Sequence, residues 1–226
     1  MKRVLFVSGT DTGVGKTVVT SGLVRALRER GERVVPVKPV ETGCADLSRP
    51  EDALALQRAA GHVPLETICP VRYRTPAAPW TAGRREGVRH SFEGLRAHIE
   101  GIDASWVVVE GAGGMLVPLD ATRSFADLAV ALNAALVLVV RDALGTLNHT
   151  RLSLEAAKTR GIPVAAVIAN AVAFPGADDV SHADELRALG LGVPVWGPLP
   201  RFDVVDPSIV AGHLASIGLV DALLRG

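Results

Sequence analysis

Short runs of aliphatic and β-branched residues alternate along the chain with segments of helical periodicity. Continuous apolar runs of this length are typical of strands buried on both faces of a parallel sheet. The runs that predict strands are Val4–Val7, Val34–Val37, Trp106–Val109, Ala135–Val140, Val164–Ala169 and Val193–Trp196. Helical spacing predicts helices over residues 17–30, 52–60, 125–132 and 147–160 and from about residue 207 onward. Strands separated by helices form right-handed βαβ units, so the pattern predicts an α/β fold with a parallel sheet.

Residues 69–89 are the least regular part of the chain and contain Pro70, Pro76 and Pro79. Long irregular connections within domains are usually functional, so we expect a surface excursion near the active site. The chain has 226 residues with no internal repeat and no linker, which predicts one large domain.

The charge is balanced, with 24 basic and 24 acidic residues. This balance argues against a protein that binds nucleic acid or a membrane surface, although it allows a local site for a charged small molecule. Cys44 and Cys69 have neither CxxC nor zinc-ligand spacing and are expected to be free thiols. The apolar run at residues 4–7 is too short for a signal peptide, and the one at residues 128–140 is too short to span a bilayer. We therefore expect a soluble cytoplasmic protein.

Residues Gly9–Thr17 follow a predicted strand and open a predicted helix, which is the setting of a phosphate-binding loop. The glycines let backbone N–H groups turn toward phosphate oxygens, and the helix N-terminus adds partial positive charge. Lys16 is expected to reach the β- and γ-phosphates of ATP, and the Thr17 hydroxyl to coordinate Mg²⁺. Because five residues separate Gly9 from Gly15 instead of the usual four, this is a lengthened variant of the loop.

Ligands of parallel α/β sheets bind beyond the carboxyl ends of the strands, where several charged residues lie in this sequence. Lys38 either stabilises charge on a transferring phosphoryl group or is an ordinary surface lysine. Glu110 is interpreted as a Mg²⁺-binding acid facing the phosphate loop rather than a solvated strand end. Asp52 is either a further metal ligand or, as the residues alone favour, a carboxylate at a helix N-terminus.

Other strand ends carry polar residues and glycines suited to a substrate. The turn after Thr42 either covers a substrate or is a plain turn. Gly145 and Thr146, at a helix start, form a candidate site for an anion such as a carboxylate, and Asn148 either belongs to it or caps the helix. Asn170 carries an amide that can pair with the edge of a nucleotide base, or it is a loop asparagine.

Together these residues resemble the dethiobiotin synthetase family. The matching stretches, which follow the family's order, are Gly9–Thr17, Lys38–Gly43, Asp52–Gln57, Val109–Gly114, Gly145–His149 and Ala169–Asn170. The lengthened phosphate loop is the form that this family has. The resemblance implies a three-layer P-loop NTPase fold with a mostly parallel central sheet of about seven strands, assembled as a homodimer.

The resemblance also implies a reaction, the ATP-dependent carboxylation and ring closure of 7,8-diaminononanoate by a cyclo-ligase. The substrate amine takes up CO₂ from the CO₂/bicarbonate pool as a carbamate, and a carbamate oxygen attacks the γ-phosphate of ATP. The neighbouring amine then attacks the carbamic-phosphoric anhydride, which gives dethiobiotin, ADP and phosphate. Because a carbamate and a triphosphate are both anions, Mg²⁺ and lysines are needed to offset their repulsion.

Carried over by position, the resemblance implies catalytic roles for Lys38, Lys16 and Thr12. It implies Mg²⁺ ligation by Thr17, Asp52 and Glu110. The implied nucleotide contacts are Asp11, Thr12, Gly13, Val14, Gly15, Lys16, Thr17, Val18, Glu110, Asn170, Pro198, Leu199 and Pro200. The implied substrate contacts are Thr42, Gly113, Gly145, Thr146, Leu147 and Asn148, of which residues 145–148 reach the substrate across the dimer interface. Gly13 stands where some members have Glu, and Asp203 is a further candidate that is left unassigned.

Three other readings of a P-loop chain are less consistent with these residues. A cobyrinate-type amidotransferase synthetase needs a glutaminase domain with a catalytic Cys, for which 226 residues leave no room. A ParA- or MinD-like switch needs an extra lysine early in the loop, and residues 10–14 hold none. A pure nucleotide-binding module would not need both Lys38 and Glu110.

Overall fold

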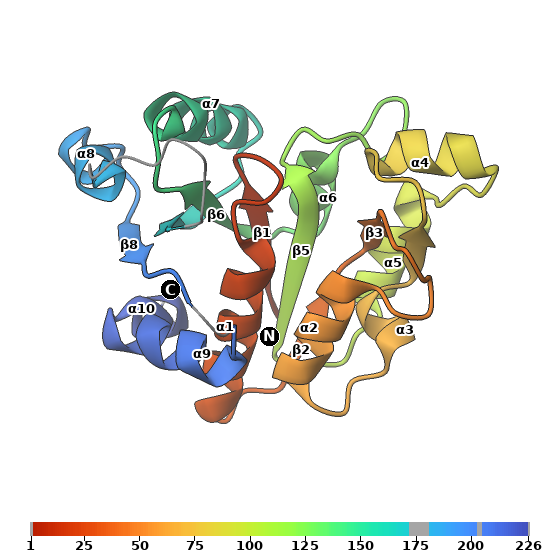
Figure 1. Ribbon diagram of the computed structural model, residues 1–226, viewed down its shortest axis with the longest axis horizontal. Helices are drawn as coiled ribbons and strands as arrows, with labels where there is room; N and C mark the ends of the chain where they lie inside the picture. Colours follow the sequence, from red (N-terminus) through yellow and green to blue (C-terminus); the bar gives the residue numbers. More distant parts are fainter. Residues whose placement is uncertain (1, 172–180, 203–204, 226) are drawn as a thin grey trace.

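The computed structural model describes residues 2–171, 181–202 and 205–225, and Asp203 lies outside them. Six strands form one parallel sheet in the order β2-β5-β1-β6-β7-β8 (Figure 1). Its strands are β1 (Arg3–Gly9), β2 (Val34–Val37), β5 (Trp106–Gly114), β6 (Ala135–Arg141), β7 (Val164–Asn170) and β8 (Val195–Leu199). The predicted α/β class with a mostly parallel central sheet is confirmed.

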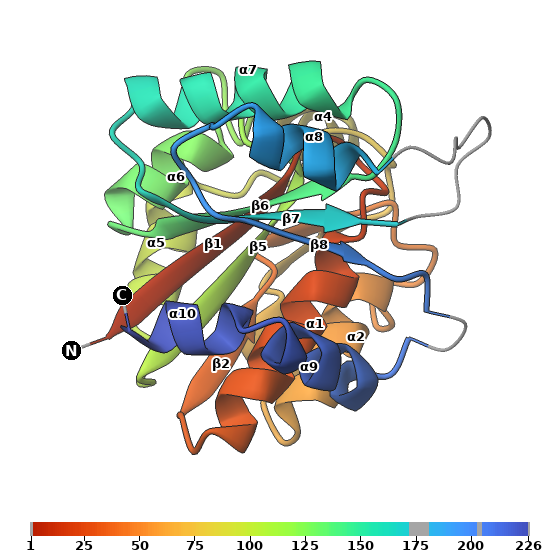
Figure 2. The same cartoon turned by 90° about the vertical axis from the view of Figure 1, so that its left-hand side faces the viewer.

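Helices cover both faces of this sheet. One face packs against α1 (Lys16–Glu29), α2 (Glu51–Ala60), α9 (Pro207–Ser216) and α10 (Leu219–Arg225). The other packs against α5 (Phe92–Glu100), α6 (Phe125–Ala131), α7 (Thr146–Thr159) and α8 (His182–Ala188). Figure 2 shows the two helical layers with the sheet between them. The result is a three-layer arrangement.

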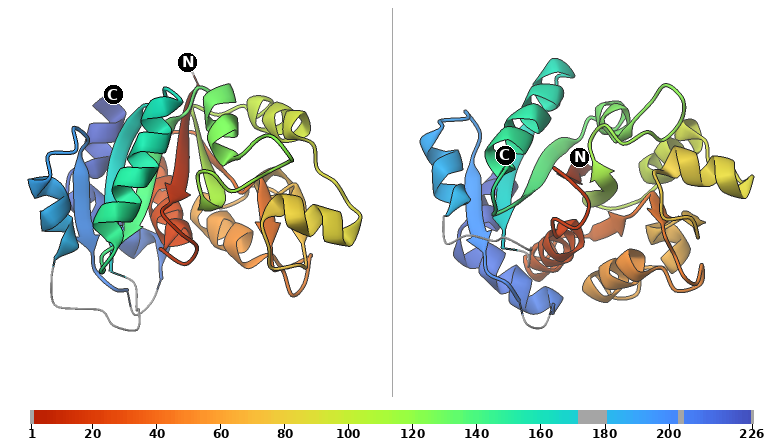
Figure 3. Two further views of the ribbon diagram at one scale, coloured as in Figure 1. Left: turned by 90° about the horizontal axis from the view of Figure 1, so that it is seen from above. Right: turned by 45° about the horizontal axis from the view of Figure 1, so that its top comes forward.

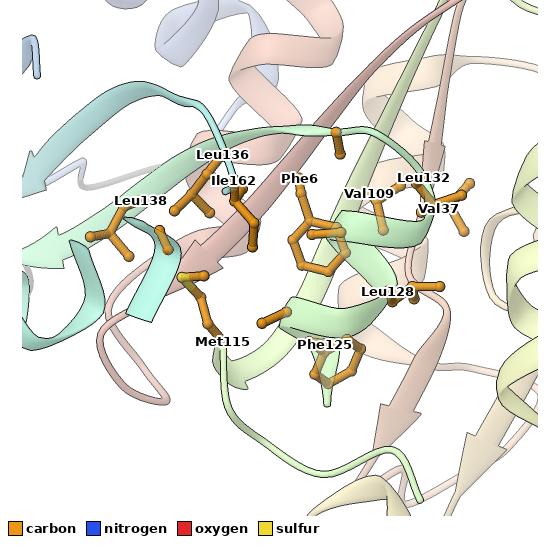
Figure 4. Packing of buried hydrophobic residues seen from close by; sticks show 14 of the residues in the cluster. Phe6, Val37, Val109, Met115, Phe125, Leu128, Leu132, Leu136, Leu138 and Ile162 are labelled. Atoms are coloured by element: carbon orange, nitrogen blue, oxygen red, sulfur yellow. The ribbon is translucent and has the colours of Figure 1, made fainter. Parts of the chain in front are cut away.

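The alternation of side chains along β1 explains how one apolar run fills two cores. Leu5 and Val7 point to the layer that holds α1, whereas Phe6 points to the layer that holds α6. Phe6 meets Phe125 of α6 with ring centroids 6.2 Å apart, and Met115 lies in the same cluster (Figure 4). With both faces buried, the strand fixes the position of the phosphate loop that follows it.

The segment from residue 69 to residue 89 differs from the expectation. It contains β4 (Val71–Tyr73), which pairs with β3 (Val40–Thr42) in a separate two-stranded sheet, and α4 (Pro79–Glu86). Tyr73 and Ala82 are buried in the core that also holds α5. Much of the segment lies at the surface, as predicted, but it is more regular than expected, because short elements with few apolar residues still pack onto the domain. Figure 3 shows α4 at the end of the molecule opposite α8.

Strand number and strand ends also differ from the expectation. The central sheet has six strands among the described residues rather than about seven. β5 continues to Gly114 because its glycine run pairs with the end of β1, where Gly9 lies opposite Gly114. Glu110 therefore lies within a strand, opposite Val7, and not after one. β8 begins at Val195, two residues later than predicted, and includes Pro198 and Leu199.

The remaining helix is α3 (Leu65–Ile68), between α2 and β4. Among the described residues no single helix is long and apolar enough to cross a bilayer. Only α9 and α10 taken together have the length and composition of a membrane span, and these two helices are bent by 73° relative to each other. Both helices bury apolar residues against α1 and the sheet.

Candidate functional site

The phosphate loop connects β1 to α1 and has the conformation that its glycines permit. Gly13 and Gly15 have φ values of 72° and 90°, in the left-handed region that favours glycine. A Cβ on Gly9 would lie 2.7 Å from a methyl carbon of Val14, so the loop closes tightly over this position. Lys16 folds back over the loop, and its Nζ donates to the carbonyl of Asp11 at 2.8 Å.

A buried charge cluster lies beside the loop, where β2 and β5 meet α1 and α2. Lys38 Nζ is 2.7 Å from both Asp52 Oδ2 and Glu110 Oε1. The Thr17 hydroxyl lies 3.0 Å from Asp52 Oδ1 and 2.9 Å from Glu110 Oε1. Lys38 is 3% exposed and Glu110 is 0% exposed. The sequence-predicted residues Thr17, Lys38, Asp52 and Glu110 are thus brought together, and Lys38 is not an ordinary surface lysine.

Burial and the neighbouring charges together shift the pKa values of these side chains. Burial alone would lower the pKa of Lys38, but the carboxylates of Glu110 and Asp52 outweigh it and hold that pKa above its usual range. Burial likewise opposes ionisation of Asp52, yet Lys38 and the Thr17 hydroxyl hold the pKa of Asp52 below its usual range. For Lys16 burial dominates and repulsion from Lys38 adds to it, which lowers its pKa to about 8. These shifts favour the charged form of Lys38 and bring the titration of Lys16 into mildly basic solution.

The oxygens around Thr17 fit a Mg²⁺ ion. Magnesium prefers oxygen ligands and is held in proteins by one or two carboxylates together with substrate phosphates. Asp52 and Glu110 offer such carboxylates on either side of the Thr17 hydroxyl. Glu110 Oε2 is buried without a hydrogen-bond partner among the described residues, which leaves one oxygen available to a cation.

Glu41 is a buried acid of this region that the sequence reasoning missed. Its two carboxylate oxygens accept from the backbone amides of Asp52 and Ala53, at 3.0 and 2.9 Å. Burial raises the pKa of Glu41, although these amide hydrogen bonds oppose the rise. A signal was present in the sequence, because a carboxylate stands between the β-branched residues Val40 and Thr42.

Two adjoining cavities of about 340 Å³ each open at this site. The first is bounded by the phosphate loop and the charge cluster and includes Gly13, Gly15, Val18 and Thr42. The second is mostly apolar, with Pro76, Ala77, Ala78, Pro79 and Val117 in its wall. Thr12, Thr42, Ala112 and Gly113 line both, so an apolar compartment adjoins the phosphate site. This agrees with the prediction that part of residues 69–89 lies near the site.

Asn170 lies at the far side of the loop, within β7. Its side-chain Nδ2 donates to the carbonyl of Val14 at 3.0 Å, and the residue is buried, so it is not a loop asparagine. Leu199 pairs with Asn170 across β7 and β8, which brings residues 198–200 beside it. The amide nitrogen of Asn170 thus supports the loop.

Residues 145–148 form the N-cap and first turn of α7, which begins at Thr146, one residue earlier than predicted. Gly145 is the N-cap, with φ 92° and no side-chain cap, so Asn148 does not cap the helix. Thr146 is buried, and its hydroxyl has no hydrogen-bond partner among the described residues. In the part of the chain that the structure describes, the walls of the two cavities beside the loop include none of these four residues. Within one chain, the start of α7 is therefore not part of the cavity walls.

Comparison with known proteins gives consistent similarities. A family model described as an AAA domain matches residues 3–208. The ATP-dependent dethiobiotin synthetase BioD of Anaeromyxobacter dehalogenans strain 2CP-C is 47% identical over 171 residues, which cover 74% of this chain and 76% of that protein. The enzyme of the same name from Chromohalobacter salexigens is 39% identical over 226 residues, which cover 93% of this chain and 94% of that protein. The MinC:MinD cell division complex of Aquifex aeolicus has a chain of similar fold, with a TM-score of 0.56 and 16% sequence identity. The similarity covers 99% of this chain and 95% of that chain.

Proposed function

Because the chain belongs to the family of ATP-dependent dethiobiotin synthetases, we propose that it closes the ureido ring of dethiobiotin at the charge cluster around Lys38. It is an ATP-dependent ligase with a P-loop fold. The observation that carries the proposal is the Lys38 ammonium, 2.7 Å from both Asp52 and Glu110 and beside the phosphate loop. A buried cation at this point favours the meeting of two anions.

The proposed reaction has three steps. One amine of 7,8-diaminononanoate forms a bond to the carbon of CO₂ and loses a proton, which gives a carbamate. A carbamate oxygen then attacks the γ-phosphorus of ATP, the bond to the β,γ-bridging oxygen breaks, and ADP leaves. The neighbouring amine attacks the carbonyl carbon of the anhydride, the bond to the phosphate oxygen breaks, and phosphate leaves as the ring closes with loss of a proton.

The chain's own residues would act mainly by position and charge. Lys16 would leave its contact with the Asp11 carbonyl and bind the β- and γ-phosphates, where it would be protonated. Lys38 and Thr12 would face the γ-phosphate and the carbamate. Thr17, Asp52 and Glu110 would hold Mg²⁺, which when bound neutralises charge on the phosphates. Loop residues Asp11 and Gly13–Val18 would surround the phosphate chain, and Gly13 supplies no carboxylate to it.

The character of the apolar cavity supports the proposal that the substrate is aliphatic. Its wall of proline, alanine and valine suits a methylene chain, and its shared border with the phosphate cavity, at Thr42 and Gly113, would hold the reacting amines. On the nucleotide side, Asn170 Oδ1 together with the backbone of residues 198–200 would meet the adenine edge.

A homodimer would complete the substrate site. The N-terminus of α7, with Gly145, Thr146, Leu147 and Asn148, would bind the substrate carboxylate of the partner subunit. Two observations support this assignment: the Thr146 hydroxyl has no hydrogen-bond partner among the described residues, and no side chain caps the first turn of α7 at Gly145. Leu144, 82% exposed beside this turn, supports a contact with a second copy.

The direct test supplies purified protein with ATP, Mg²⁺, bicarbonate and 7,8-diaminononanoate. ADP and a product of dethiobiotin mass are expected in equal amounts, and omission of either the diamine or bicarbonate should stop both. A Lys158→Met variant, changed at an exposed lysine on α7, is the control and should retain full activity. ATP hydrolysis that needs DNA or lipid, without a dethiobiotin product, would contradict the proposal.

A further inference from the structure

Glu41 acts as the N-cap of a helix to which it does not belong. It lies in β3, is 5% exposed, and binds the backbone N–H groups of Asp52 and Ala53. These are the second and third residues of α2, whose amides a side chain at the N-cap usually satisfies. The N-cap residue of α2 is Pro50, which makes no side-chain hydrogen bond. The cap is therefore supplied from β3.

This contact joins two of the groups that form the charge cluster. Glu41 is three residues from Lys38 on the same chain segment, and the amide it binds at 3.0 Å belongs to Asp52 itself. The Asp52 side chain then reaches back to Lys38 and to Thr17. A closed circuit of contacts thus runs from the β2–β3 segment to the first turn of α2 and back.

We propose that Glu41 is a positioning residue that fixes the first turn of α2, so that the Asp52 carboxylate stays between Lys38 and Thr17 at the Mg²⁺ site. This inference rests on the proposed role of Asp52 as a Mg²⁺ ligand. Each oxygen of Glu41 faces a backbone N–H, so Glu41 acts on the metal site through α2. The carboxylate also complements the positive end of that helix.

Loss of a group that orients a metal ligand typically weakens metal affinity about 10–100-fold. Glu41→Ala removes both acceptors and is expected to weaken Mn²⁺ binding to the ADP complex by about tenfold. Glu41→Gln keeps the shape and one acceptor oxygen, and its loss should be smaller. Glu51→Gln is the matched control, because Glu51 is an exposed acid in the same first turn of α2.

The readout is Mn²⁺ affinity, measured from the electron paramagnetic resonance signal of free Mn²⁺, beside ADP affinity in EDTA measured by calorimetry. The Glu41 variants should lose Mn²⁺ affinity while their metal-free ADP affinity stays within about twofold, a split that general loosening of the fold would not produce. The Glu51→Gln variant should match the unmodified protein in both. If Glu41→Ala does not fold, Glu41→Gln provides the same comparison.

The inference is overturned if Glu41→Gln binds Mn²⁺ like the unmodified protein, or if Glu51→Gln loses as much affinity. Asp52→Asn separates this result from a failure of the proposed function. If Asp52→Asn weakens Mn²⁺ binding and the Glu41 variants do not, only the role of Glu41 is wrong. If Asp52→Asn binds Mn²⁺ normally, the proposed metal site itself is wrong.

Discussion

Replacing Lys38 by methionine removes the ammonium group that lies 2.7 Å from both Asp52 Oδ2 and Glu110 Oε1. Methionine roughly preserves the volume of the side chain, so the cost of a cavity is small. The change therefore isolates the charge. In the protein without nucleotide or metal, it leaves Glu110 with the Thr17 hydroxyl as its donor within the cluster.

The expected loss in the free energy of unfolding is about 3–5 kcal/mol, the cost of breaking a buried ion pair by removing one partner. Most of it comes from Glu110, whose side chain is 0% exposed. The Asp52 side chain is 41% exposed, so water screens its interaction and its share is small. For a chain of this size, the loss corresponds to a fall in melting temperature of roughly 6–20 °C.

Urea unfolding followed by circular dichroism in EDTA measures this quantity. Lys158→Met is the control, since an exposed lysine should change stability by no more than about 0.5 kcal/mol. Glu110→Gln and the double variant Lys38→Met/Glu110→Gln complete a double-mutant cycle. The double variant should be less destabilised than the sum of the single changes by about 2–3 kcal/mol, because no unpaired buried charge remains between these two positions. A Lys38→Met protein within 1 kcal/mol of the unmodified chain, or additive changes in the cycle, would refute this reasoning.

Three further outcomes follow from the same site. Lys38→Ala should reduce kcat about 10²–10³-fold with the KM for ATP changed no more than a few-fold; steady-state kinetics with equal kcat would remove Lys38 from the mechanism. Because the pKa of Lys16 is lowered to about 8, its charged form is lost as pH rises through 8, and nucleotide anions prefer that charged form. The Kd for ADP should therefore rise about tenfold between pH 7 and pH 9 in calorimetry, whereas a constant Kd would contradict the assignment. Gly9→Ala should reduce ADP affinity at least about tenfold by forcing the loop open, since its Cβ would meet Val14 at 2.7 Å and the Asp11 carbonyl at 2.8 Å; unchanged affinity would mean that the loop adapts.

Local chemistry explains which parts of the fold could be predicted from the sequence. The strand, glycine loop and helix from β1 to α1 form a contiguous segment, and the glycines that its turns need lie within that segment. The expectation that Lys38 and Glu110 both lie near the phosphate loop followed from a general rule, because parallel strands bring their carboxyl ends to one edge of a sheet. Neither prediction required knowledge of distant contacts.

Contacts between distant segments explain what the sequence pattern missed. The extension of β5 to Gly114 depends on its pairing with Gly9. The pairing of β3 with β4 joins segments about thirty residues apart, and each has only three residues of strand, too few for a periodic signal. The reach of Glu41 to α2 is likewise set by tertiary packing, as is the hydrogen bond from Asn170 to Val14.

The central claim, attack of a carbamate oxygen on the γ-phosphate, is tested most directly by the fate of oxygen from bicarbonate. The protein would be mixed with ATP, Mg²⁺, 7,8-diaminononanoate and ¹⁸O-labelled bicarbonate, and quenched before the label exchanges with water. One ¹⁸O atom should appear in each phosphate, detected by phosphorus nuclear magnetic resonance, and one in the ureido carbonyl of the product. Phosphate that carries no bicarbonate oxygen, and takes up label only from ¹⁸O-water, would contradict the account.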